Sequence, residues 1–316
     1  MKTLSVVFSF RNEEQNLVKL VNRVSEAIKR NTSWNYELVF VNDNSDDLSE
    51  MILKKLQEKY PIKIINLSRR FGGPASIIAG FNHAIGDCII YMDSDLQDPP
   101  ELIPELLKKY DEGFDIVHTV RLNRLGENMI KLLITKVAYK IINLFSEIKL
   151  IENAGDYKLI SRRALEEIKK FNEHEPYVRG LVTLVGFKQG IVNYTREARY
   201  KGLTKFHLLS SAGPVKEFLR GITGFSMFPL YSSIIIGILT LIFSLFLVLY
   251  FLYAKFSGIS VSGSTSILIT IVFFSGVIIT LIGVISLYII RVFEEVRGRQ
   301  RYIIKNIIDY KKKYNE

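Results

Sequence analysis

The chain has 316 residues, which is long enough for one sizeable domain and an additional segment. Its single cysteine, Cys88, excludes an intrachain disulfide and is consistent with a reducing compartment. The formal net charge is +10, of which residues 291–316 contribute +4 directly after two apolar stretches. A basic tail in that position favours contact with anionic lipid headgroups, and we expect no nucleic-acid partner.

The first two-thirds of the chain alternates short β-branched runs with amphipathic stretches. This pattern is typical of a mostly parallel sheet covered by helices, and it predicts a nucleotide-binding α/β domain. Strands are predicted at residues 4–9, 37–42, 62–66, 87–92 and 115–119. Helices are predicted between them, at residues 13–29, 48–59, 75–84 and 101–110.

Polar residues follow each of the first four predicted strands. In sheets of this kind, ligands bind at the carboxyl ends of the strands. Four loops therefore meet at one edge of the predicted sheet and mark it as the binding edge. Their sequences are Phe10-Arg11-Asn12-Glu13, Asn42-Asp43-Asn44-Ser45, Ser68-Arg69-Arg70-Phe71-Gly72-Gly73 and Asp93-Ser94-Asp95.

The fourth loop contains two carboxylates that can act together. Asp93 and Asp95 lie on the same side of an extended segment, because strand side chains repeat every second residue. Two carboxylates so placed suit Mg²⁺ or Mn²⁺ bound together with substrate phosphates. The pair follows an apolar strand and precedes Leu96-Gln97-Asp98-Pro99-Pro100, a setting that favours a metal site over a solvated turn.

Two uncharged apolar stretches near the C-terminus, residues 230–254 and 266–290, each exceed the roughly 20 residues that a membrane-spanning helix requires. The preceding residues, 207–228, have the mixed composition of a helix in the membrane interface. Excess Lys and Arg beside the spans predicts that the N-terminal region and the tail face the cytoplasm. The predicted parts are a catalytic domain (1–206), an interfacial segment (207–228), two transmembrane helices with a short external linker (229–290) and a basic tail (291–316).

Several segments resemble the family 2 glycosyltransferases, and within them the bacterial polyprenyl-phosphate glycosyltransferases that are related to dolichyl-phosphate mannose synthase. The resemblance covers nearly the whole chain, and the long acidic motif and the two-span ending are its most specific parts. The segments that carry it are Phe40-Val41-Asn42-Asp43-Asn44-Ser45, Ser68-Arg69-Arg70-Phe71-Gly72, Met92-Asp93-Ser94-Asp95-Leu96-Gln97-Asp98-Pro99-Pro100-Glu101, Gly155-Asp156-Tyr157-Lys158-Leu159, residues 199–205 and Arg291-Val292-Phe293-Glu294-Glu295-Val296.

The resemblance implies a GT-A fold, a UDP-sugar donor and an inverting single displacement. Asp43 would recognise the uridine, while Asp93 and Asp95 would hold the ribose and the metal beside the diphosphate. Asn42 departs from the two consecutive acids that are common across the wider family. The residues expected at the nucleotide-sugar site are Phe10, Asn12, Glu13, Asp43, Arg69, Asp93, Ser94 and Asp95.

The resemblance also implies residues for the acceptor side of the reaction. Asp156 is the family's candidate for the catalytic base. A lipid phosphate is already anionic near neutral pH, so Asp156 would act either as a base or as a group that orients the acceptor. Arg199 and Lys205 lie in a basic loop just before the interfacial segment, where they can supply cations for the phosphate of the lipid.

The predicted function is transfer of a sugar, commonly glucose in this family, from a UDP-sugar to polyprenyl phosphate at the bacterial cytoplasmic membrane. A homo-oligomer, a tetramer by resemblance, is also expected. One alternative is a processive polysaccharide synthase, which would need a translocation channel and a Q-x-x-R-W type motif. The other is a non-catalytic flippase or adaptor for lipid-linked sugars, which would leave Asp43, Asp93, Asp95 and Asp156 without a purpose.

Overall fold

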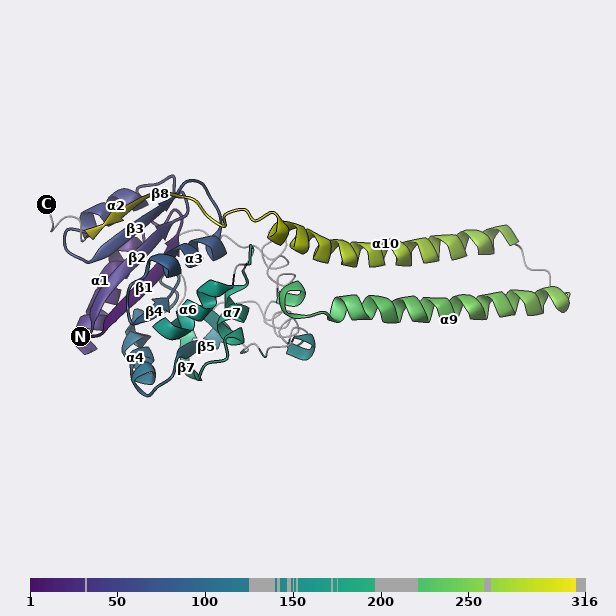
Figure 1. Ribbon diagram of the computed structural model, residues 1–316, viewed down its shortest axis with the longest axis horizontal. Coiled ribbons are helices and arrows are strands. Elements are labelled where there is room, and N and C mark those ends of the chain that lie inside the picture. The colour runs from purple at the N-terminus through teal and green to yellow at the C-terminus, as the bar shows by residue number, and fades with distance from the viewer. Residues whose placement is uncertain are drawn as a thin grey trace.

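A computed structural model describes residues 1–31, 33–124, 140, 143–146, 149, 151, 153–171, 173–174, 176–196, 221–258 and 263–310 of the chain. These residues form a sheet-based domain from which two long helices extend side by side (Figure 1). The predicted basic loop with Arg199 and Lys205, and most of the predicted interfacial segment, lie outside the described residues.

The domain is built on an eight-stranded sheet with the order β7-β5-β6-β4-β1-β2-β3-β8. The central strands β4, β1, β2 and β3 run parallel, as do β5 and β7. Antiparallel pairs join β6 to both β4 and β5, and β8 to β3. The strands span Thr3–Phe10 (β1), Asn35–Asn42 (β2), Ile62–Leu67 (β3), Cys88–Tyr91 (β4), Ile116–Arg124 (β5), Ala154–Ser161 (β6), Gln189–Arg196 (β7) and Ile304–Asp309 (β8).

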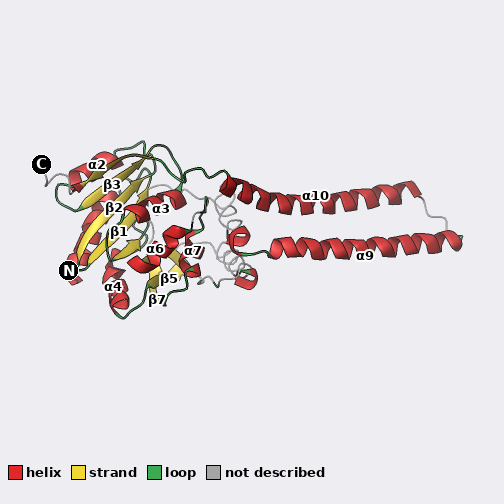
Figure 2. Ribbon diagram, viewed as in Figure 1, coloured by secondary structure: helices red, strands yellow, loops and turns green. Residues whose placement is uncertain are grey.

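Helices cover both faces of the sheet (Figure 2). The apolar side chains of α1, α2 and α4 form one core cluster with Val6 and Phe8, whereas those of α3, α6 and α7 form a second cluster with Val7. Neighbouring residues of β1 thus serve opposite faces, as the two-residue period of a strand requires. The helices span Leu17–Asn31 (α1), Ser49–Leu56 (α2), Gly73–His83 (α3), Ile103–Asp111 (α4), Arg162–Lys170 (α6) and Val178–Leu184 (α7), with a 3₁₀ turn at Pro100–Leu102 (η1).

The mixed, mostly parallel sheet between two helical layers confirms the predicted fold class. All five predicted strands and all four predicted helices are present, with ends shifted by up to five residues. The sheet also contains β6, β7 and β8, which the sequence pattern did not predict. These strands carry charged or amide residues in their interiors, such as Lys158 and Asn306, and therefore lack the apolar run that a buried strand normally shows.

The helix α3 lies unusually close to the sheet because Gly80 has no side chain at the contact. A Cβ atom at this position would lie 2.3 Å from Cγ1 of Val7 and 3.2 Å from Cγ2 of Val41. Both distances are shorter than ordinary van der Waals contact. The close approach holds α3, and with it the loop that leads into the helix from β3, against the strand-end edge of the sheet.

The two long helices are α9 (Phe228–Phe256) and α10 (Gly263–Val296). All of α9 and residues Thr270–Val296 of α10 are long and apolar enough to cross a membrane, with mean hydropathies of 2.8 and 2.5, and most of their large apolar side chains are exposed. Arg291 directly follows the second predicted span, and α10 continues past it to Val296. The guanidinium of Arg291 is 3.2 Å from a carboxylate oxygen of Glu173 in the domain.

The segment after α10, which belongs to the predicted basic tail, returns to the sheet. Residues 304–309 form β8 against the outer edge of β3, with Asn66 opposite Asn306 and Lys63 opposite Asp309. The ammonium of Lys63 lies 3.7 Å from the carboxylate of Asp309. The sheet domain therefore includes residues from beyond both long helices.

Gly80→Ala should destabilise the domain by about 1–3 kcal/mol, because the added methyl group overpacks the contact with Val7. Gly73→Ala is a matched control in the same helix, since no atom lies within 4 Å of its added Cβ. Thermal unfolding of the purified full-length wild type and both variants measures the effect. A Gly80 variant as stable as the wild type would contradict the tight contact.

Candidate active site

Two carboxylates from different strands meet at the predicted binding edge. The strand β4 ends at Tyr91, and Asp93 follows two residues later. The strand β6 runs antiparallel beside β4, with Lys158 opposite Tyr91. Continuing this register by two residues places Asp156 beside Asp93. The structure thus brings together the predicted metal loop and the predicted catalytic aspartate.

The local electrostatics show that this edge concentrates negative charge. Burial raises the pKa of Asp93 from 3.8 to about 7. Three neighbouring carboxylates add to the rise, in the order Asp98, Asp156 and Asp95, and the guanidinium of Arg121 opposes it. Like charges in a buried site disfavour each other's ionisation, which is the physical origin of this shift. A cation or a cationic group would relieve the repulsion.

Asp156 is held by a two-pronged ion pair with Arg179, the second residue of α7. Nε of Arg179 donates to Oδ1 of Asp156 at 2.8 Å, and Nη2 donates to Oδ2 at 2.6 Å. Burial alone would raise the pKa of Asp156, but Arg179 outweighs it and holds that pKa below the ordinary value of 3.8, with help from Lys158 and Arg121. The carboxylate is therefore ionised and fixed in orientation.

A second arginine, Arg121, pairs with Asp98, which follows the acidic loop. Nε of Arg121 donates to the hydroxyl of Tyr194 at 2.9 Å, and its Nη2 lies 3.6 Å from Oδ1 of Asp98. The Tyr194 hydroxyl in turn donates to Oδ1 of Asp98, which is fully buried. This network fixes the loop that carries Asp93 and Asp95. From the sequence, Asp98 was identified only as part of a motif, and both arginines were missed. Each arginine lies far along the chain from the aspartate with which it pairs, so no local sequence pattern identifies it.

The loop after β2 is tied to the loop after β3 through Asp43. Its Oδ1 accepts a hydrogen bond from the backbone N–H of Phe71 at 2.6 Å, and its Oδ2 accepts one from Gly72 at 3.0 Å. Gly72 has φ +96°, a conformation that favours glycine. The guanidinium of Arg69 stacks over the ring of Phe71, 4.0 Å from its centroid. Asp43, the predicted uridine-binding residue, thus shapes the neighbouring loop that contains Arg69.

The loop after β1 is fastened to the loop after β2. Asn12, which has φ +55°, donates its backbone N–H to Oγ of Ser45 at 3.0 Å and accepts from the backbone N–H of Asp46 at 2.9 Å. Glu13 is buried, and its carboxylate accepts from the side chain of Asn16. Phe10 is also buried and lies in the core cluster of α1. Of the three residues predicted here for nucleotide binding, only Asn12 is exposed.

The acidic loop is folded back on the end of β1. Oγ of Ser94 donates to the backbone carbonyl of Ser9 at 3.2 Å, and Oδ1 of Asp95 accepts from the backbone N–H of Gln97 at 3.2 Å. Within the described ranges, no group of three His, Cys, Asp or Glu side chains is placed to hold a metal by itself. Asp93 and Asp95 nevertheless fit Mg²⁺ or Mn²⁺, because such ions are often held by one or two carboxylates and completed by substrate phosphates and water.

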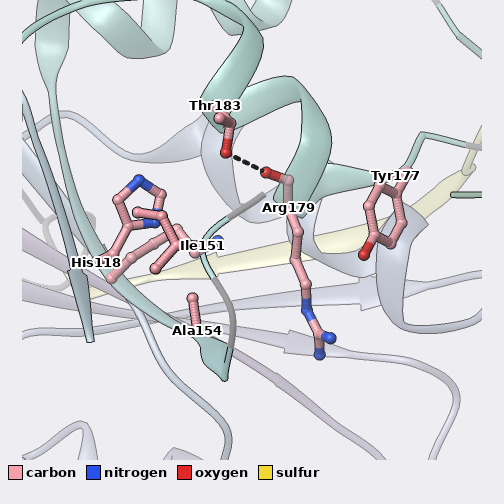
Figure 3. Close-up of a pocket in the computed structure, with 7 residues that line it drawn as sticks. His118, Ile151, Ala154, Tyr177, Arg179 and Thr183 are labelled. Atoms are coloured by element: carbon pink, nitrogen blue, oxygen red, sulfur yellow. Dashed lines mark hydrogen bonds between the residues drawn. The ribbon is translucent and has the colours of Figure 1, made fainter. Parts of the chain in front are cut away.

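A pocket adjoins the Asp156–Arg179 pair, between β5, β6 and α7 (Figure 3). Its lining includes His118, Lys158 and Arg179. Burial lowers the pKa of His118 from 6.5 to about 4, and burial lowers the pKa of Lys158 from 10.5 to about 8, although Asp156 opposes the latter shift. Near neutral pH, the wall of this pocket therefore contains two cationic side chains beside a neutral histidine.

Comparisons with known proteins give the family. Residues 5–169 match the family model of glycosyl transferase family 2. An uncharacterized glycosyltransferase of Synechocystis is 38% identical over 310 residues, which cover 96% of this chain and 95% of that protein. A prophage bactoprenol glucosyl transferase homolog of Escherichia coli is 35% identical over 312 residues, which cover 96% of this chain and 99% of that protein.

Solved structures give a weaker likeness. The crystal structure of S. aureus TarS 1–349 in complex with UDP-GlcNAc has a TM-score of 0.49 and 18% identity, over 71% of this chain and 66% of that chain. The family model, by contrast, covers more than half of the sequence, and the relatives match it over nearly its whole length. The chain therefore belongs to glycosyl transferase family 2 and is a glycosyltransferase.

Proposed function

We propose that the chain transfers a sugar from a UDP-sugar to the phosphate of a polyprenyl phosphate lipid at the cytoplasmic surface of a membrane. The observation that carries the proposal is the cluster of Asp93, Asp95 and Asp156 at the strand-end edge of a domain attached to two long apolar helices. Relatives that match nearly the whole chain are named bactoprenol glucosyl transferases, which supports a polyprenyl phosphate acceptor and glucose as the sugar.

In this proposal, the loops that follow the parallel strands bind the UDP-sugar donor. The loops after β1, β2 and β3 are joined by side-chain hydrogen bonds through Asn12 and Asp43, and they form one continuous rim for the nucleotide. The diphosphate then lies toward Asp93 and Asp95. A divalent cation held by these two carboxylates would stabilise the negative charge that develops on the departing diphosphate.

In this proposal, the lipid phosphate acceptor lies beside β6 and α7, which carry Asp156 and Arg179. A phosphate oxygen of the lipid attacks the anomeric carbon from the face opposite the diphosphate, so one C–O bond forms as the other breaks and the configuration inverts. The low pKa that Arg179 gives Asp156 makes this carboxylate a weak proton acceptor. An anionic lipid phosphate has little need of a base. We therefore assign Asp156 to orienting the acceptor and stabilising positive charge at the reacting carbon.

The position of the tail supports the membrane topology. The domain precedes α9, and β8 follows α10 yet pairs with β3 in the same sheet. The chain therefore leaves the domain and comes back to it, which fits two crossings of the bilayer. The excess of Lys and Arg in the domain and the tail supports a cytoplasmic location for both. Assembly as a homo-oligomer, a tetramer by the family resemblance, belongs to the same proposal.

The most direct test is to incubate the detergent-solubilised protein with undecaprenyl phosphate and a panel of UDP-sugars, and then to weigh the lipid product. One product mass identifies the donor sugar and the acceptor together. We expect a polyprenyl-phosphate hexose from UDP-glucose. Transfer to a growing polysaccharide, or transfer to no lipid at all, would overturn the proposed function.

Transfer should depend on a divalent cation. We expect EDTA to abolish product formation and added Mg²⁺ or Mn²⁺ to restore it, because Asp93 and Asp95 are placed to hold the donor diphosphate through a metal. Asp95→Ala should be inactive under all these conditions. Asp111→Asn, at an exposed carboxylate that pairs with Lys2, is the control and should keep wild-type activity. Full activity of the chelated wild type would refute the metal site.

The basic loop should serve the acceptor and not the donor. Arg199→Ala or Lys205→Ala would remove a charge-assisted contact worth about 1.5–3 kcal/mol, which corresponds to a loss of roughly tenfold or more in transfer. Lys205→Arg keeps the charge and should be intermediate. Affinity for UDP should stay unchanged in all three variants.

The measurement pairs calorimetric UDP affinity with the transfer rate as a function of polyprenyl phosphate concentration. Lys54→Ala removes an exposed cation from α2, at the end of the domain far from α9 and α10 (Figure 1), and should alter neither quantity. A fall in UDP affinity that parallels the fall in transfer would assign the basic loop to the donor.

A further inference from the structure

Three asparagine side chains lie side by side across the strands β2, β3 and β8. Asn42 pairs in register with Asn66, and Asn66 pairs with Asn306. The side-chain Nδ2 of Asn42 donates to Oδ1 of Asn66 at 2.9 Å, and Nδ2 of Asn66 donates to Oδ1 of Asn306 at 2.9 Å. We call these three residues the amide ladder. It runs from the segment that follows α10 to the strand that carries the predicted uridine-binding loop.

The inner members of the amide ladder depend on their partners. Asn42 and Asn66 are each only 4% exposed, whereas Asn306 is exposed. A buried amide without a partner is costly, so the two inner side chains keep their orientation only while the outer one accepts the hydrogen bond. The exposed position of Asn306 means that its replacement leaves no cavity in the core.

The amide ladder ends at the donor rim. Oδ1 of Asn42 accepts a hydrogen bond from the backbone N–H of Ser45 at 2.9 Å, and Oγ of Ser45 accepts one from the backbone N–H of Asn12 at 3.0 Å. Asn12 and Asn44 both have positive φ, at 55° and 57°. Such conformations cost energy outside glycine and persist only where surrounding contacts hold them. The orientation of Asn42 is therefore one of the restraints that fix this rim.

The segment between α10 and β8, which leads to the outer end of the amide ladder, is itself hydrogen-bonded to the domain. The backbone carbonyl of Ile303 accepts from the N–H of Ser68, the first residue of the loop that contains Arg69, at 2.8 Å. The hydroxyl of Tyr302 accepts from the side chain of Asn82 at 2.8 Å, and Arg301 donates to the carbonyl of Phe171 at 2.7 Å. The segment between α10 and β8 is thus bound to the domain at three points.

We propose that Asn306 is a positioning residue for the donor site, acting through Asn66 and Asn42 on the loop that contains Asp43. It contacts neither donor nor acceptor. That the ligand of this loop is a uridine nucleotide rests on the proposed function, whereas the mechanical link from β8 to the loop rests on the hydrogen bonds alone. The segment after the second long helix then completes the nucleotide site as well as the sheet.

The test compares three full-length variants. Asn306→Leu removes the acceptor oxygen, Asn306→Asp keeps it, and Lys305→Ala changes an exposed neighbour on the same strand. We expect Asn306→Leu to weaken calorimetric UDP affinity and to raise the donor KM, each by about threefold to tenfold, which is the range for one lost hydrogen bond. The value of kcat should change by less than about twofold, because Asn306 does not contact the reacting groups. Asn306→Asp and Lys305→Ala should match the wild type.

A second measurement does not depend on the donor. Hydrogen–deuterium exchange of residues 42–46 should be faster in Asn306→Leu than in the wild type, and should return to the wild-type rate in Asn306→Asp. Unchanged exchange in the leucine variant would overturn the positioning role. So would a lower unfolding temperature without any change in UDP affinity or in exchange at this loop. If the wild type binds no UDP, but exchange at residues 42–46 is still faster in Asn306→Leu than in the wild type, the proposed donor is refuted and the positioning role of the amide ladder is kept.

Discussion

The strand-end edge that contains Asp93 and Asp156 depends on the balance between buried carboxylates and two arginines. Burying several negative charges together is unfavourable unless cations or hydrogen bonds compensate them. Arg179 compensates Asp156, and Arg121 compensates Asp98 with help from Tyr194. Asp93 is left with a raised pKa of about 7, so compensation within the protein is incomplete. A bound cation would relieve this imbalance, as the proposed function expects.

The direction of the strands divides this edge into two parts. The parallel strands β1, β2 and β3 deliver loops that are joined to one another and that we propose bind the donor. Antiparallel β6 then places Asp156 beside the end of β4, while β5 and β7 bring Arg121 and Tyr194 behind it. A continuation of the parallel pattern at this position would have sent β6 in the opposite direction, with Asp156 at the other end of the sheet.

Local sequence patterns predicted the strands in the parallel half of the domain well. Apolar runs followed by polar loops identified β1 to β5, and the spacing of Asp93 and Asp95 identified the acidic loop. The other half depends on contacts between residues that are distant in the sequence, such as Asp98 with Tyr194 and Asp156 with Arg179. Such contacts produce no periodic pattern in the local sequence. The strand β8 was missed for the same reason. Its Lys and Asn residues suit a partly exposed edge strand and look like a polar tail in isolation.

The return of the chain to β3 has a consequence for biogenesis. The residues of β8 are synthesised only after those of both long helices, so the outer edge of β3 stays unpaired while α9 and α10 are being made. An unpaired strand edge invites pairing with other chains. Pairing of β8 with β3 can therefore complete the sheet only after both long helices have been synthesised. A nascent chain arrested between α10 and β8 would expose an unpaired strand edge, so the last described strand of the chain also protects the sheet against pairing with other chains.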